Sequence, residues 1–386
     1  MRDVDMALLR DSGPCGDADT AMNRVHEILG VRIAAADRLR TAILQDLSST
    51  SHGIEWWMKS GDTQRRILVS DQLMAASASI TTNLTEAVLH QWEHKSAWEL
   101  VERRYARVCK PDGTLNFPEF ATAADLVPEL VSTMHVAGFF RALGSALDCL
   151  AATTIGVAAI PQDILKADFA GIHAWLRGER NKADLRHSIH TALLDRIDDA
   201  ARQAGPPGWL EWMFAYRNMI VHRGRRTELR AMKVDAQILD AAGKPVPRTT
   251  PIAVLLREPG VSNVAAFVRL RMEQLTLSEN ADVTLTECVR SCVYLARTIL
   301  GFLLDVWVQR RQDPEQLLQP LDRQWPEVST QTQIAFDGYA PGTVHVDFDK
   351  AINNDVDVRR LEAAALRASD VDSIWGQPDD KSPDSA

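Results

Sequence analysis

The sequence predicts a mainly α-helical protein, because apolar residues recur every three or four positions over long windows. Strand-like runs are confined to short segments, and Gly, Pro and Asp-Gly clusters separate the helical windows. With 386 residues, of which 46% are hydrophobic and 25% charged, the chain has the composition of a soluble globular protein. This length is enough for about two or three domains.

The first 125 residues are predicted to form an N-terminal helical domain. Helical periodicity covers residues 20–47 and resumes over 63–108, where it predicts one or two helices. The stretch CKPDGTLNFPEF at 109–120 then supplies the Pro and Asp-Gly punctuation of a domain boundary. This domain is a candidate surface for a protein partner.

Residues 126–312 are predicted to form a second helical domain with an insertion. Its expected helices cover 127–158, 187–204, 205–224 and 280–312, and the last has the strongest periodicity. The segment 205–224 opens with Gly-Pro-Pro-Gly and closes at Gly224, which are helix start and stop signals. Between about 227 and 277, β-branched runs beside Gly and Pro predict a small strand-containing insertion.

Residues 313–386 are predicted to be an acidic C-terminal extension. They contain 15 acidic and 6 basic residues, a net charge of −9 that equals the net charge of the whole chain. The segment 332–348 is typical of a minor β-hairpin, 356–368 of a short helix, and the polar end of a disordered tail. The first 312 residues are therefore neutral overall, so the acidic net charge of the chain does not argue against a local basic face that binds nucleic acid.

The sequence points to a cytoplasmic protein without a membrane partner. Its N-terminus has no apolar secretory segment, and the apolar run at 142–161 contains an Asp and is expected to be a buried core helix. The five cysteines are odd in number, which suits a reducing compartment. Cys288 and Cys292 share one helical face and are expected to be core residues rather than metal ligands.

The stretch WMFAYRNMIVHRGRR at 212–226 interrupts an apolar helix with polar residues. At 100° per residue, Asn218 and His222 lie on one helical face, whereas Arg217 points about 140° away from His222. A second copy of the helix could place its Arg217 beside His222, and this geometry favours a homodimer.

These residue types suit the cleavage of RNA without a metal. His222 could exchange protons with the ribose 2′-hydroxyl and the leaving 5′-oxygen, Arg217 could stabilise the phosphate charge, and Asn218 could orient the groups. The product would carry a 2′,3′-cyclic phosphate. A basic run just outside the helix could bind flanking RNA phosphates, and it comprises Arg223, Arg225, Arg226, Arg230 and Lys233.

The arrangement Arg-Asn-x-x-x-His at the end of an apolar helix resembles the HEPN superfamily, over roughly residues 130–312. The resemblance implies a HEPN-type helical bundle, a homodimeric and metal-independent endoribonuclease, and Arg217 and His222 as its catalytic pair. It also implies a role as a toxin or in defence against phage. No metal or other cofactor is expected.

The polar residues of 217–222 could instead be structural. In that case Arg217 pairs with a carboxylate such as Glu211, and Asn218 and His222 hydrogen-bond buried backbone.

Three further alternatives remain open at the level of sequence. Arg180, Asn181 and His187 fit a looser form of the same motif, although they lie in a charged segment. His90 and His94 have metal-ligand spacing on one helical face and could belong to a metal-dependent enzyme. The helical domain could also be a non-catalytic adaptor that binds a protein or a nucleotide.

Overall fold

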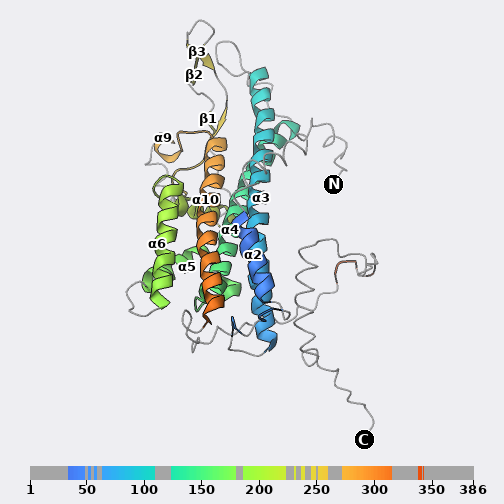
Figure 1. Cartoon of the computed structure of the whole chain (residues 1–386). Coiled ribbons are helices and arrows are strands. Elements are labelled where there is room, and N and C mark those ends of the chain that lie inside the picture. The colour runs from blue at the N-terminus through green and yellow to red at the C-terminus, as the bar shows by residue number, and fades with distance from the viewer. Residues whose placement is uncertain are drawn as a thin grey trace. The chain divides into compact units, whose positions relative to one another are not determined.

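The protein is mainly α-helical, as the periodicity predicts (Figure 1). The computed structural model describes residues 34–47, 51–53, 56–58, 63–108, 123–179, 186–222, 230–231, 236–239, 245–248, 251–259, 272–314, 338–340 and 342. The helices are α2 (Ala34–Asp46), α3 (Thr63–Val108), α4 (Ala123–Ala158), α5 (Phe169–Glu179), α6 (Arg186–Ala204), α7 (Trp209–His222), α9 (Met272–Leu275) and α10 (Ala281–Gln312), with a 3-10 turn η2 at Ile164–Lys166.

The long helices follow the predicted windows closely. The window 63–108 is a single helix, α3, and α10 coincides with the predicted helix at 280–312 to within a residue. Helix α4 ends before Pro161 in a turn in which Ala159 has a positive φ of 49°. There the amide of Ile160 donates to the carbonyl of Ile155 over 3.1 Å, which satisfies one of the last carbonyls of the helix.

The predicted strand-containing insertion is confirmed. Strand β1 (Arg230–Ala231) pairs with β4 (Ile252–Ala253), and β2 (Ala236–Leu239) pairs with β3 (Pro245–Arg248), both antiparallel. The predicted C-terminal hairpin and the helix at 356–368 lie outside the described residues, apart from 338–340 and 342.

Helix α5 was not predicted from the sequence, which was interpreted there as a charged segment. Asp168 precedes the helix, and its carboxylate accepts a hydrogen bond of 2.7 Å from the backbone amide of Gly171. The amide of Phe169, the first residue of α5, donates to the carboxylate of Asp148 over 3.3 Å. An Asp before an apolar turn is a helix start signal, so Asp168 was the available clue.

The contacts group the chain into two compact units, each assembled from separated segments. The first unit comprises residues 1–33, 82–146 and 199–295, and the second comprises 34–81, 147–198 and 296–386. In the first unit, the Phe140 ring of α4 packs against Trp212 and Tyr216 of α7, with centroid distances of 5.7 and 4.6 Å. In the second unit, Trp57 and Trp307 lie in the core, 6.3 Å apart between centroids. The domain borders expected near 125 and 312 stay predictions.

Within the described part of the chain, two helical stretches, Val127–Ala158 and Ala281–Gln312, are long and apolar enough to cross a membrane by length and composition. The most apolar window is 78% buried inside the protein in the first stretch and 56% in the second. Core helices of soluble proteins pass the same test. The cytoplasmic location and the absence of a membrane partner stay predictions.

Candidate functional site

Helix α7 begins at a tight turn that joins it to α6. Gly208 has a φ of +82°, a conformation that glycine adopts without strain, and its carbonyl accepts the amide of Trp212 over 2.9 Å. The indole Nε1 of Trp209 reaches back to the carbonyl of Ala201 at the end of α6, over 2.8 Å. The Gly-Pro-Pro-Gly stretch therefore sets the start of α7, as predicted.

One face of α7 is anchored in the first unit. Met213 and Tyr216 are buried, and the Sγ atom of Cys292 on α10 lies 3.6 Å from the Sδ atom of Met213. Trp212 donates its Nε1 to the carbonyl of Leu256 over 3.0 Å, which ties the helix to the segment after β4. Large aromatic and sulfur-containing side chains thus fix both the depth and the rotation of the helix.

The opposite face of α7 is exposed and carries part of the predicted motif. Glu211, Ala215 and Asn218 are all exposed, and position 222 falls on the same face by helical spacing. His222 is the last residue of the helix, and its side chain lies outside the described set. The backbone thus places Asn218 and His222 together, as the spacing predicts.

Arg217 lies at the border between these two faces, against α4. It is half-buried, and a Cβ atom added at Gly144 would lie 2.5 Å from its Nε and 2.7 Å from its Cδ. The Arg217 side chain therefore occupies space that any residue larger than glycine at position 144 would fill. Within the first unit, α4 thus holds Arg217 while the neighbouring Asn218 stays exposed.

The predicted basic run follows α7 directly. Arg230 lies in β1, where it pairs with the buried Ala253 of β4, so its backbone is anchored in the same unit as α7. The other members lie outside the described residues, and they are Arg223, Arg225, Arg226 and Lys233.

The rival motif lies largely outside the described residues. Arg180 and Asn181 lie outside the described residues, and His187 is the second residue of α6, with a side chain that is not described. The neighbouring His190 is buried and its Nε2 lies 3.0 Å from the carbonyl of Ala158. His190 therefore has a structural role.

His90 and His94 do not come together as a pair of metal ligands. His94 is buried, and its Nδ1 lies 2.9 Å from the hydroxyl of Ser132 on α4. His90 instead faces His135 of α4, with 2.9 Å between the two Nδ1 atoms. Burial, and then the charge of His90, lower the pKa of His135. This pair could not be predicted from the sequence, because His90 and His135 are 45 positions apart.

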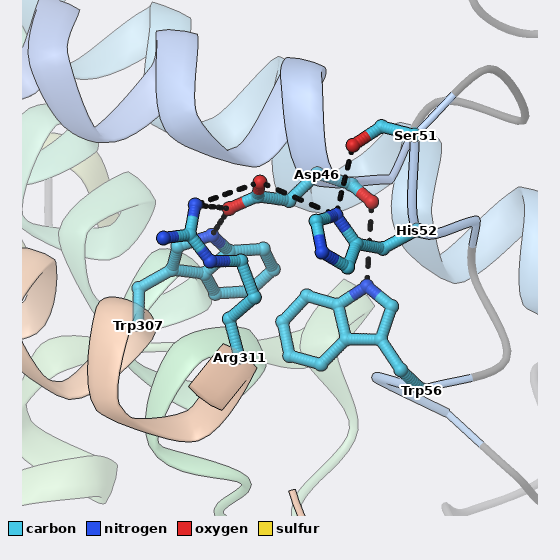
Figure 2. A network of polar contacts seen from close by, with 6 residues as sticks. All are labelled: Asp46, Ser51, His52, Trp56, Trp307 and Arg311. Carbon is cyan, nitrogen blue, oxygen red and sulfur yellow. Dashed lines mark hydrogen bonds and ion pairs between the residues drawn. The ribbon is translucent and has the colours of Figure 1, made fainter. Parts of the chain in front are cut away.

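A second polar cluster, around Asp46, was also missed from the sequence. Asp46 is buried at the end of α2 and accepts Nε1 of Trp307 over 2.9 Å (Figure 2). Arg311 donates Nη1 to both carboxylate oxygens, over 3.1 and 3.3 Å. The network joins α2 to α10 within the second unit, and each buried charge in it has a partner.

The same cluster brings together Ser51, His52 and Asp46, the residue types of a hydrolase triad. However, the Ser51 hydroxyl lies 2.8 Å from Nδ1 of His52, and the Asp46 carboxylate approaches the same Nδ1 at 3.9 Å (Figure 2). In a triad the nucleophile and the acid contact opposite nitrogens of the ring. The geometry therefore favours a structural network over a nucleophilic site.

Arg310 is a buried cation that caps the end of α4. Its Nη1 donates to the carbonyls of Gly156 and Val157, over 2.9 and 3.2 Å, and its Nη2 donates to that of Trp57 over 2.6 Å. Burial lowers the pKa of Arg310 to about 9, so the side chain remains charged at neutral pH. A cation at a helix C-terminus is favourable, which assigns Arg310 to stability.

No family model, curated protein or solved structure matches the chain. The resemblance to the HEPN superfamily therefore rests on the motif of α7 and its helical surroundings.

Proposed function

We propose that the protein is a homodimeric, metal-independent endoribonuclease of HEPN type. Its active site would form around Arg217, Asn218 and His222, with RNA as substrate and a toxin or phage-defence role as context. The observation that carries the proposal is the end of α7. There Arg217 is held against Gly144 while Asn218 and position 222 share the exposed face.

The chemistry assigns each residue a role. His222 takes the proton of a ribose 2′-hydroxyl and returns a proton to the 5′-oxygen as the phosphodiester breaks. Arg217 carries a permanent charge, so it stabilises the charge that develops on the phosphate. Asn218 orients the reacting groups by hydrogen bonding. The products are a 2′,3′-cyclic phosphate and a 5′-hydroxyl.

The basic run supports RNA as the substrate. It begins one residue beyond α7, and the backbone of Arg230 is anchored by its pairing with β4. Cations at such places contact phosphates whatever the base sequence, so binding should weaken as salt rises.

The test is cleavage of structured and total RNA in EDTA by the parent protein and by His222→Ala. We expect the variant to lose roughly 10²- to 10⁴-fold in rate, because it lacks the general acid and base. Analysis of the product ends should find 2′,3′-cyclic phosphate. His187→Ala, from the rival motif, is the matched control and should cleave at the parent rate. Equal cleavage by the parent and His222→Ala would refute the proposal.

A second candidate function is a non-catalytic adaptor, and the surface of α4 favours it. Val127, Leu130 and Met134 are exposed large apolar residues at helical spacing on that helix. Exposed apolar clusters of this kind often mark protein-binding sites. An adaptor predicts that no RNA is cleaved, and that Leu130→Glu weakens binding of a partner whereas His222→Ala does not.

A further inference from the structure

His90 of α3 and His135 of α4 present two imidazole nitrogens to each other. Their Nδ1 atoms are 2.9 Å apart and their ring centroids 5.2 Å apart. The His90 side chain is 25% exposed, and His135 is only half-buried, so solvent and small ions can reach the pair. One proton is enough to bridge the two nitrogens, and the other nitrogen then keeps its lone pair.

Glu86 decides which nitrogen of His90 keeps that lone pair. Its carboxylate lies one helical turn before His90, with Oε1 3.5 Å from Nε2 of the ring. A negative charge at this distance favours the proton on Nε2, which leaves Nδ1 of His90 free to accept. Carboxylates hold metal-binding histidines in the same way, by orienting the ring from behind.

Gly138 fixes the position of the His90 ring. A Cβ atom added at Gly138 would lie 2.4 Å from both Cε1 and Nε2 of His90, so the ring rests on the backbone of α4. The ring therefore has little freedom to turn away from His135. The position of the His90 ring is therefore set by the packing of α3 against α4.

We propose that His90 and His135 bind a divalent transition metal, Zn²⁺, Ni²⁺ or Cu²⁺, between their Nδ1 atoms. Metal to imidazole bonds measure about 2.0 to 2.1 Å, so two nitrogens 2.9 Å apart suit a metal that they ligate at about a right angle. Imidazole is a preferred ligand of these three metals. On binding, His135 transfers its bridging proton from Nδ1 to Nε2 through solvent, and no net proton is released.

Water completes the coordination sphere. His94 is not a third ligand, because its Nδ1 is already engaged by Ser132. Among the residues that the structure describes, no group of three or more His, Cys, Asp or Glu side chains is gathered as in a metal site. With two protein ligands the site is open and reversible, and the metal links α3 to α4.

Calorimetric titration of chelator-treated and dialysed full-length protein with each metal tests the proposal. We expect one metal per chain, a higher melting temperature with metal and reversal by EDTA, since a ligand that binds only the folded state stabilises it. Bound Cu²⁺ should show nitrogen couplings in its electron paramagnetic resonance spectrum. These readouts do not depend on RNA cleavage, which should proceed in EDTA whether or not this site exists.

Substitutions identify the ligands. His90→Gln and His135→Gln should each abolish stoichiometric binding, and Glu86→Gln, at an exposed position, should weaken it by roughly 10-fold. His173→Gln is the matched control, because His173 contacts a carboxylate, Asp198, over 2.7 Å rather than a second imidazole. Its affinity for metal should equal that of the parent. Stoichiometric binding that survives both substitutions at His90 and His135, or no binding by the parent, would overturn the proposal.

Discussion

Cys288 and Cys292 lie one helical turn apart on α10, and both thiols are buried. Burial raises the pKa of Cys288 to about 12, with further contributions from Glu279 and Glu287, and it raises the pKa of Cys292 as well. The thiolate is the reactive form of cysteine, so both side chains should be inert in the folded protein. Their role as core residues was predictable from helical spacing and apolar neighbours, and the structure confirms it.

We expect alkylation at mildly alkaline pH to leave Cys288 and Cys292 unmodified in the native protein. Both should react after unfolding in guanidinium chloride, because the thiols then ionise freely. Mass spectrometry of the labelled peptides measures this directly, with the less buried Cys149 as the internal comparison. Rapid labelling of Cys288 in the native state would contradict the burial of α10.

The histidine and arginine contacts show what spacing along the chain cannot reveal. The spacing of His90 and His94 correctly placed both on one helix, α3, but their actual neighbours, His135 and Ser132, lie on α4. Likewise, nothing in the motif around Arg217 indicated that its side chain would lie on Gly144. Such pairs depend on how two helices pack, and a single sequence carries no signal for that packing.

At the scale of elements, the boundaries of α7 were predictable because they have local causes. The Gly-Pro-Pro-Gly turn precedes Trp209, and the helix ends at His222, two residues before Gly224. Helix α5 was missed because its charged neighbours obscured a short apolar turn that an Asp cap initiates. Long helices need no such cap to be found, since their periodicity extends over many turns.

The contact between α4 and α7 yields a prediction about Gly144. In Gly144→Ala the new methyl group displaces Arg217, so we expect RNA cleavage to fall by about 10²-fold, as small misplacements of catalytic groups do. Single-turnover rates measure this loss. The helix itself should tolerate alanine, because alanine favours helices more than glycine does.

Gly301→Ala on α10 is the matched control. A Cβ atom there would meet nothing within 4 Å, so the protein should gain about 0.5 to 1 kcal/mol in its free energy of unfolding and keep its activity. Denaturant unfolding of both variants measures their stability. It therefore shows whether a loss of cleavage comes from destabilisation of the fold or from displacement of Arg217. Unchanged cleavage in Gly144→Ala would show that the packing of Arg217 does not matter for activity.

At the scale of the whole molecule, the prediction of a mainly α-helical fold is confirmed. The grouping of the chain into two compact units was not predictable from the sequence. The two compact units draw on segments far apart in the chain, and four of their five borders fall inside helices, namely α3, α4, α6 and α10. Apolar periodicity continues through such borders, so composition and punctuation carry no sign of them. Sequence signals mark turns, whereas these units are defined by contacts between distant segments.

A homodimer is the proposed whole-molecule feature on which the proposed active site depends. Because Arg217 points about 140° away from position 222, one helix does not place the two groups together. Val221 is 44% exposed at the end of α7, and a two-fold contact between two α7 helices would bury it. Such a contact would also bring the Arg of one copy toward the His of the other.

Val221→Glu should therefore convert the dimer to a monomer and abolish RNA cleavage, because two carboxylates would face each other across the two-fold contact. Like charges opposed in an interface cost several kcal/mol, whereas an added carboxylate at an exposed helical position costs the monomer little. Val283→Glu, at a 47% exposed position in the first turn of α10, is the matched control and should remain an active dimer. Light scattering coupled to size-exclusion chromatography measures the mass, and circular dichroism checks the helices. A Val221→Glu variant that stays dimeric would place the interface elsewhere, and one that is monomeric yet cleaves RNA normally would remove the need for a second copy.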